Sequence, residues 1–331
     1  MKLRYTGQKP QQEMFQAFNE TMRFLFEQDQ RVVYLDADLM GSLKTHDLWK
    51  AYPKNVFNTG IQEANMIGVA CGLNLNGFKP YVHSFSPFAS RRVFDQLFLS
   101  AAYAGKSLRV IGSDAGIMAT HNGGTHMCFE DVAIMRTIPN ACVIDVTDAV
   151  MLKHFLVSVK DRPGVTYLRI ARRDVPDVYP EGTSFEEGKG IILQEGTDVT
   201  LLSCGIMVAT CLQAAALLQA QGVSAQVVDI VTVKPLDKEL LLACARKTGA
   251  VLVAENANIL GGLGAAAAEC LCEEYPIPVT RVGIQDQFGQ VGPEAFLREK
   301  YGLTAHHIAK RALDLIQKKN LLKGKNIHEQ R

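Results

Sequence analysis

The chain has 331 residues, of which 47% are hydrophobic and 21% are charged, and its formal net charge at pH 7 is +1. This length is enough for two ordinary domains, each with its own core. Acidic and basic residues are interspersed, which excludes a strongly basic nucleic-acid-binding surface. The first ten residues lack the apolar core of a signal peptide, and no apolar run approaches about 18 residues, so no membrane span is expected.

Short apolar runs alternate with amphipathic stretches through the first half of the chain. This alternation predicts a parallel sheet with helices on both faces. The expected strands are Arg31–Leu35, Lys79–Phe85, Leu108–Gly112, Ala141–Val146 and Val165–Ile170. The expected helices are Gln11–Gln28, Ile61–Leu75, Arg91–Tyr103, Glu130–Thr137 and Asp148–Val159.

A Pro- and Asp-rich segment at 174–184 is typical of a linker, and the same alternation restarts after it. Further strands are expected at Val199–Ser203, Ala225–Ile230, Ala250–Ala254 and Val279–Val282, and helices at Ile206–Gln221, Asp237–Lys247 and Leu263–Glu274. We therefore expect an α/β protein with two parallel-sheet domains, residues 1–178 and 190–331. The last ten residues or so are expected to form a mobile tail.

The eight cysteines are scattered, several of them in apolar runs. Only Cys270 and Cys272 are close together, and they lie in an Ala-rich stretch without metal-ligand spacing. We interpret all eight as reduced thiols of a cytoplasmic protein.

Glu63 is an unexpected carboxylate in a mostly apolar, small-residue stretch, 58–73. Thr59 is placed to cap the expected helix, and Ile67 and Ala70 share a helical face with Glu63. Burial of an unpaired carboxylate favours its neutral form, which can donate a proton to a ring nitrogen. Thiamine diphosphate is a cofactor that needs such a donor, at N1′ of its aminopyrimidine. A core glutamate that is satisfied by its neighbours would explain the same pattern.

Phe85 and Phe88 follow at the C-terminal end of the strand 79–85, on either side of Pro87. Open α/β sheets bind ligands at this edge, and two aromatic side chains there could hold a flat ring between them. The alternative is that both rings only fill the core.

The loop 113–126 is rich in Gly, Asn and His and follows a strand. Loops of this kind carry function on a rigid scaffold. His121, Asn122 and His126 could bind hydroxyls or a phosphate, and His126 could also shuttle protons. Because the two histidines have no carboxylate pair nearby, we do not expect a metal site here.

Two further segments could bind anions. Three arginines end the strand at 167–173, and arginine forks suit a phosphate, although a solvated edge with surface ion pairs would have the same composition. The segment Gly261–Gly264 opens an Ala-rich helix and could cradle an anion or only pack that helix.

Taken together, these segments resemble the C-terminal half of the transketolase family over about residues 8–315, in the family's order and spacing. Gly60–Glu63 matches the motif whose glutamate bonds the pyrimidine N1′ of thiamine diphosphate. Phe85 and Phe88 match the aromatic pair on the pyrimidine, and Arg91 falls at a nearby position that varies in the family. The resemblance implies a pyrimidine-binding domain followed by the family's C-terminal domain.

The resemblance also implies substrate contacts. Segment 123–126 matches the family's substrate-facing loop that ends in Thr-His, which gives His126 a catalytic role. Asp38 and Ser42 lie where the family places acceptor-side contacts, and Arg172 matches the arginine that holds a sugar phosphate.

The substrate side also departs from the family pattern. Asn122 stands where the family usually has Asp, His121 replaces a residue that is often acidic, and Met127 replaces the usual Gln. Cofactor use is therefore expected to be retained, whereas the sequence does not name the donor or the acceptor sugar.

Family members that act alone carry an N-terminal domain with a Gly-Asp-Gly segment and a downstream Asn, which hold Mg²⁺ and the diphosphate. No such segment occurs here. The resemblance therefore implies one subunit of a split enzyme, with an N-terminal partner subunit that supplies the diphosphate and Mg²⁺ sites. Self-association across a two-fold axis, in a heterotetramer, is also expected, with no nucleic-acid or membrane partner.

The leading hypothesis is transfer of a two-carbon ketol unit from a ketose, expected to be a sugar phosphate, to an aldose. A second hypothesis is the β subunit of a 2-oxoacid dehydrogenase, which shares this architecture; the Thr125–His126 loop and Arg172 favour the first. A third is a non-catalytic scaffold subunit, against which the presence of Glu63, Phe85 and Phe88 argues.

Overall fold

Two β-sheets organise the chain, which the computed structural model describes over residues 3–172 and 174–329. The first sheet contains β1 Val32–Asp36, β2 Val56–Asn58, β3 Lys79–Phe85, β4 Leu108–Ser113, β5 Cys142–Asp145, β6 Val165–Arg169 and β10 Thr232–Lys234. The second contains β7 Ile191–Gln194, β8 Val199–Ser203, β9 Ala225–Asp229, β11 Val251–Asn258 and β12 Val279–Ile284.

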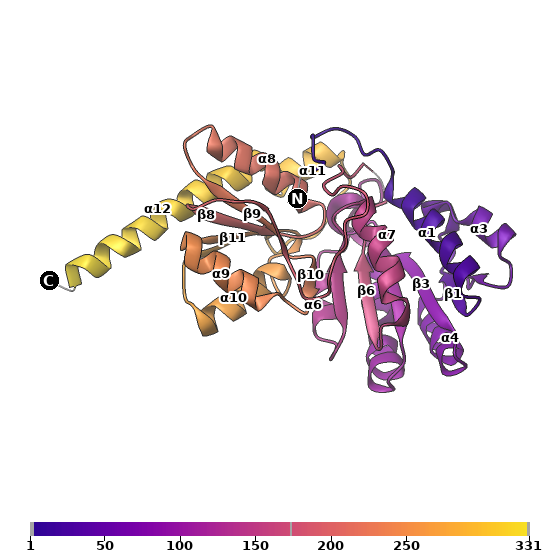
Figure 1. Ribbon diagram of the computed structural model, residues 1–331. Coiled ribbons are helices and arrows are strands. Elements are labelled where there is room, and N and C mark those ends of the chain that lie inside the picture. Colours follow the sequence, from indigo (N-terminus) through magenta and orange to yellow (C-terminus); the bar gives the residue numbers. More distant parts are fainter. Residues whose placement is uncertain (1–2, 173, 330–331) are drawn as a thin grey trace.

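The strand order is β10-β5-β6-β4-β3-β1-β2 in the first sheet and β12-β11-β8-β9-β7 in the second. Neighbouring strands are parallel, except that β10 and β7, at the sheet edges, run antiparallel to β5 and β9. Figure 1 shows the two sheets side by side, with helices packed against them. The expected α/β class with two mostly parallel sheets is confirmed. The strands β2, β7 and β10 were not predicted, because runs of three or four residues show no clear alternation.

Both faces of the first sheet are buried. Its helices are α1 Met14–Gln28, α2 Met40–Leu43, α3 His46–Ala51, α4 Glu63–Leu75, α5 Ser86–Ser90, α6 Asp131–Arg136 and α7 Ala149–Ser158. Tyr34 and Tyr81 belong to the same core as α1 and α7, whereas Val33 and Val82 belong to the core that includes α4. Successive strand residues thus point to opposite faces, as the pleat of a parallel sheet requires.

The helix expected at 91–103 is interrupted. After α5, Arg91–Val93 forms a 3₁₀ turn, and Gln96–Tyr103 forms a π-helical segment. Ser90 lies outside the helical region, with φ −120° and ψ −80°. Its hydroxyl donates to the Ser86 carbonyl at 2.6 Å, a side-chain bond that competes with regular helix geometry. The interruption sets the directions of the two arginines that follow it.

The second sheet also lies between two layers of helices, which are α8 Met207–Gln219, α9 Lys238–Thr248, α10 Leu263–Glu274, α11 Glu294–Lys300 and α12 Ala305–Glu329. Helices α8 and α12 pack together on one side, and α9 and α10 on the other (Figure 1). Asp237 caps α9 by accepting a hydrogen bond from the Leu240 N–H at 3.0 Å, and Gly249 ends this helix with a φ of 68°.

Helix α12 continues through most of the segment that was expected to be a tail, so this part of the chain is helical. The helix projects beyond the second sheet (Figure 1). Although it has 25 residues, neither it nor any other helix in the described part of the chain is long and apolar enough to cross a membrane.

Residues 174–190, between the two units, have no regular secondary structure, yet they are firmly packed. Val178 and Tyr179 are buried, and their N–H groups donate to Asp148 Oδ2 at 2.9 Å and 2.8 Å. The Tyr179 hydroxyl donates to Asp229 Oδ2 at 2.8 Å. Because β10 leaves the second unit to pair with β5, the two units share a continuous interface, which we call the seam.

Candidate active site

Glu63 is the first residue of α4 and lies beside the end of β3. Its side chain is only 2% exposed. The Ser84 hydroxyl donates to Glu63 Oε1 at 3.0 Å, and Arg92 Nη1 lies 2.8 Å from both carboxylate oxygens. The expectation of an unpaired carboxylate is therefore wrong. Thr59 does not cap the helix either, because its hydroxyl donates to the Asp36 carbonyl at 3.1 Å.

A guanidinium lies over Phe88, one of the two aromatic rings selected from the sequence. Arg92 Cζ lies 3.9 Å from the centroid of the Phe88 ring, and the centroids of Phe85 and Phe88 are 6.4 Å apart. His126 presents its edge to both rings, at centroid distances of 5.9 Å from Phe85 and 5.2 Å from Phe88. The structure thus gathers Glu63, Phe85, Phe88 and His126 in one place. We call the three rings of Phe85, Phe88 and His126 the aromatic wall.

These groups fit the aminopyrimidine end of thiamine diphosphate. A flat ring can stack on an aromatic face, and a buried carboxylate can share a proton with a ring nitrogen. Arg92 already makes both kinds of contact, since its planar group lies over Phe88 and its N–H groups bond to Glu63. A planar group that carries nitrogen can thus bond to Glu63 and lie on the Phe88 ring at the same time.

The sequence reasoning chose Arg91 and missed Arg92. Arg91 Nε lies 2.8 Å from Glu130 Oε1, and Arg91 lines a different cavity, together with Phe288 and Asp286. A usable signal was present, because Arg92 is four residues after Phe88, the spacing at which side chains meet on a helix.

A cavity of about 250 Å³ lies next to the aromatic wall. The residues that line it are Asp114, Met118, Ala119, Thr120, His121, Asn122, Arg172, Asp174, Pro293 and Glu294. Arg172 Nε donates to Asp114 Oδ1 at 2.6 Å, and its Nη1 donates to the Ser42 carbonyl at 3.3 Å. Arg172 Cζ is also 5.8 Å from the Phe85 ring centroid, which connects the cavity with the wall.

The other residues selected from the sequence lie at different places. His121 and Asn122 line the cavity, and Ser42 reaches it through its carbonyl bond to Arg172. Asp38 is not among the lining residues; its Oδ1 accepts from Asn58 Nδ2 at 2.9 Å. Within the described residues, no group of three or more His, Cys, Asp or Glu side chains is arranged to hold a metal ion.

A buried chain of polar groups ends at Asp114, and sequence reasoning missed it. Asp36 Oδ2 lies 2.8 Å from His83 Nδ1, and His83 Nε2 lies 2.9 Å from Ser113 Oγ. Ser113 Oγ in turn donates to Asp114 Oδ2 at 3.2 Å. The order matches an Asp-His-Ser triad, but Ser113 is fully buried and bonded onward, so it is no exposed nucleophile. The chain instead fixes Asp114, whose pKa is raised by burial.

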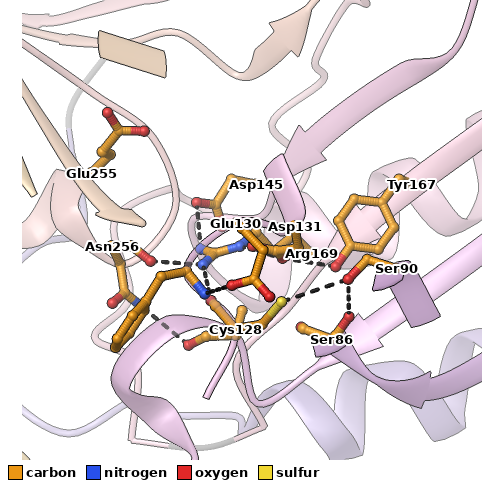
Figure 2. Close-up of polar contacts among 12 residues, drawn as sticks. Ser86, Ser90, Cys128, Glu130, Asp131, Asp145, Tyr167, Arg169, Glu255 and Asn256 are labelled. Atoms are coloured by element: carbon orange, nitrogen blue, oxygen red, sulfur yellow. Dashed lines mark hydrogen bonds and ion pairs between the residues drawn. The ribbon is translucent and has the colours of Figure 1, made fainter. Parts of the chain in front are cut away.

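A second buried network joins the two units at their seam. Figure 2 shows Arg169 between Asp131 and Asp145, beside Asn256 of β11. Arg169 Nε lies 2.8 Å from Asp131 Oδ2, and its Nη1 lies 2.9 Å from Asp145 Oδ2. Its Nη2 donates to the Asn256 carbonyl at 2.6 Å. The guanidinium is therefore bonded on several sides, away from water.

The same seam holds the start of the loop 113–126. The Asn256 side chain accepts from the Ile117 N–H and donates to the Ala115 carbonyl, both at 3.1 Å. Gly116 lies between them with a φ of 60°, and a Cβ at this position would overlap Asn256. The second unit thus positions the loop that carries His121, Asn122 and His126.

Comparisons with known proteins cover both units. The family model described as the transketolase pyrimidine-binding domain matches residues 10–177, and the one described as the transketolase C-terminal domain matches residues 188–308. The chain is 48% identical to the 6-deoxy-6-sulfo-D-fructose transketolase subunit SqwH of Clostridium sp. (strain MSTE9), over 89% of this chain and 91% of that protein.

Two further proteins are similar over almost their whole length. The chain is 32% identical to a subunit of the apulose-4-phosphate transketolase of Phocaeicola vulgatus, over 91% of this chain and 97% of that protein. A solved structure described as a split gene transketolase, inactive beta4 tetramer, has a TM-score of 0.84 and 39% sequence identity. This likeness covers 92% of the chain and 98% of the solved one.

Proposed function

The chain belongs to the transketolase family, and we propose that it is the C-terminal subunit of a two-subunit transketolase, which moves a two-carbon ketol unit from a ketose to an aldose. The observation that carries the proposal is the buried Glu63 carboxylate beside the rings of Phe85 and Phe88. Both rings are only half-buried, so a second chain can complete the binding site over them.

An N-terminal partner subunit supplies the diphosphate and Mg²⁺ sites in this proposal. Two relatives named as transketolase subunits support it, because the chain covers nearly all of each. The similar solved structure is described as an inactive tetramer of one kind of chain, which is consistent with self-association and with a requirement for another subunit. The active assembly is then a heterotetramer.

The residues of this chain have separate tasks. Bound thiamine diphosphate supplies the electron sink for breaking a carbon–carbon bond, and the protein supplies orientation and charge. With the cofactor bound, Glu63 would hold a proton at the pyrimidine N1′, in place of its present bonds to Arg92. Phe85 and Phe88 would hold the ring, whereas Arg91, at the family's variable position, pairs with Glu130 and is not needed to hold it.

The substrate contacts lie on the other side of the aromatic wall. His126 donates a hydrogen bond to a substrate oxygen near the reacting carbons. His121, Asn122 and Arg172 bind the distal part of the sugar in the cavity that they line. Asp38 and Ser42 contribute on the acceptor side.

The substrate is a sugar, so the proposed role belongs to carbohydrate metabolism. The two named relatives do not agree on its terminal group, because one is named for a sulfonated ketose and the other for a sugar phosphate. The proposed compartment is the cytoplasm, because all eight cysteines are free and seven of them are buried.

The test is reconstitution with the N-terminal partner, sought in the neighbouring reading frame. We expect saturable binding of thiamine diphosphate with Mg²⁺, and ketol transfer from a ketose to an aldehyde. Glu63→Ala should lower turnover by at least about 100-fold, the usual range for loss of a positioned proton-transfer group. Near-normal turnover of Glu63→Ala would contradict the assignment. Turnover of a 2-oxoacid with a redox dye, and of no ketose, would indicate a 2-oxoacid dehydrogenase instead.

A further inference from the structure

A loop of the second unit, residues 285–292, presents an aromatic side chain to solvent near the candidate active site. Phe288 is 94% exposed, and Val291 in the same loop is 61% exposed. One exposed apolar side chain on a surface needs no explanation. Here two of them stand on one loop, beside a site that the proposed function leaves for a second chain to cover. We call residues 285–292 the Phe288 loop.

Contacts from both units fix the backbone of the Phe288 loop. The Tyr301 hydroxyl, in the second unit, donates to the Phe288 carbonyl at 3.1 Å. Gly289 packs against Gly124 of the first unit so closely that a Cβ on Gly124 would lie 2.6 Å from the Gly289 carbonyl oxygen. The loop is therefore held firmly in place, whereas Phe288 itself remains almost fully exposed.

A cavity of about 330 Å³ lies between the Phe288 loop and the first unit. Phe288 lines it on one side, and Met127 and Phe129, which are nearly buried, give it an apolar floor. Gly124 and Met127, which both line the cavity, flank His126 of the aromatic wall along the chain. The cavity therefore connects the surroundings of the aromatic wall with Phe288.

On the basis of the proposed function, we propose that the Phe288 loop is a docking surface for the N-terminal partner subunit, which receives the Phe288 ring in an apolar recess. The partner has to lie over the half-buried rings of Phe85 and Phe88 to complete the cofactor site, and the cavity continues from there to the loop. An aromatic side chain on a fixed backbone loses little conformational freedom on binding, and such residues dominate the binding energy of protein interfaces.

The experiment titrates the full chain with the partner from the neighbouring reading frame, by calorimetry in the presence of thiamine diphosphate and Mg²⁺. We expect Phe288→Ala to raise the Kd of the two subunits by at least about 30-fold, which corresponds to about 2 kcal/mol at an interface hot spot. Phe288→Leu keeps an apolar side chain and should raise the Kd by less than about tenfold. Phe24→Ala is the control, because Phe24 is exposed on α1, and its Kd should stay within about threefold of the wild type.

Two further measurements separate the proposal from its rivals. If Phe288→Ala leaves the Kd unchanged and instead weakens self-association of the chain alone, in sedimentation velocity, a second copy covers the loop and the proposal is wrong. If the Kd is unchanged and the KM for a ketose rises in the assembled enzyme, Phe288 faces the substrate, which also overturns the proposal. If the wild-type chain does not bind the partner at all, the proposed function itself fails.

Discussion

The seam between the two units and the candidate active site both join arginines to carboxylates, but they do so at different depths. Arg169 in the seam is 1% exposed and is bonded to two carboxylates and a carbonyl. In the site, the side chains of Arg92 and Arg172 are 42% and 24% exposed, while their partners Glu63 and Asp114 are buried. A fully bonded, buried arginine stabilises the fold, whereas a half-open pair can exchange one partner for a ligand.

The largest effect should come from the seam. Arg169→Met leaves Asp131 and Asp145 buried without their cation, and loss of one partner of a buried pair costs about 3–5 kcal/mol of unfolding free energy. Arg31→Met is the matched control, because Arg31 is 61% exposed and pairs with Asp29 at the surface. Denaturant unfolding should show a loss below about 1 kcal/mol for the control. Equal losses for both variants would remove the distinction between seam and surface.

The seam should also make stability depend on pH. Glu255, which precedes Asn256 in β11, is 2% exposed, and this burial raises its pKa from 4.5 to about 7, against the hydrogen bonds from the N–H groups of Leu263 and Gly264, which lower it. The folded chain thus binds this proton more tightly than the unfolded chain. The resulting stability is fully present below about pH 4.5 and is lost as the pH rises through about 7, by at most about 3 kcal/mol.

Thermal unfolding between about pH 5 and pH 7.5 measures this slope. The Tm of the wild type should fall as the pH rises, and Glu255→Gln should make the decline shallower. Asp229, whose pKa is raised by burial to about 6, leaves a remaining slope of the same sign. A Tm that rises across this range in the wild type would contradict the account.

The smallest effect separates the two adjacent arginines. Arg92→Ala leaves the buried Glu63 without its cation and should cost the cofactor-free chain about 1–2 kcal/mol, after discounting for the exposure of Arg92. Arg91→Ala should cost less than about 0.5 kcal/mol, because its pair with Glu130 is exposed to solvent. Urea unfolding of the two variants makes the comparison, and the reverse order would show that Arg92 does not support Glu63.

The sequence was sufficient to locate the cofactor side of the site, but not to predict the contacts that its side chains make. The alternation of apolar runs was enough to predict most strands, and Phe85 and Phe88 were found because they end one of them. The pairing of Glu63 was not foreseen, since its partner Arg92 lies 29 residues further along and is directed by the interruption after Ser90. The position of Arg92 four residues after Phe88 indicates a contact with that ring, but nothing in a single sequence indicates that the same guanidinium reaches Glu63.

The substrate side depended more strongly on the fold. Asp36, His83 and Ser113 come from three neighbouring strands, β1, β3 and β4, and their hydrogen bonds follow from strand register rather than from sequence spacing. Asp114 lies in the loop 113–126 but was not singled out. Its ion pair with Arg172 could not be predicted, because it forms only when the fold brings the residues after β6 alongside this loop.

The most direct test of the account is the exchange of the C2 proton of thiamine diphosphate with deuterium, measured on cofactor bound to the assembled enzyme. This exchange reports activation of the cofactor without any sugar. We expect Glu63→Ala to slow it by at least about 100-fold, while Arg91→Ala exchanges at the wild-type rate. An unchanged exchange rate in Glu63→Ala would show that this carboxylate does not act on the cofactor.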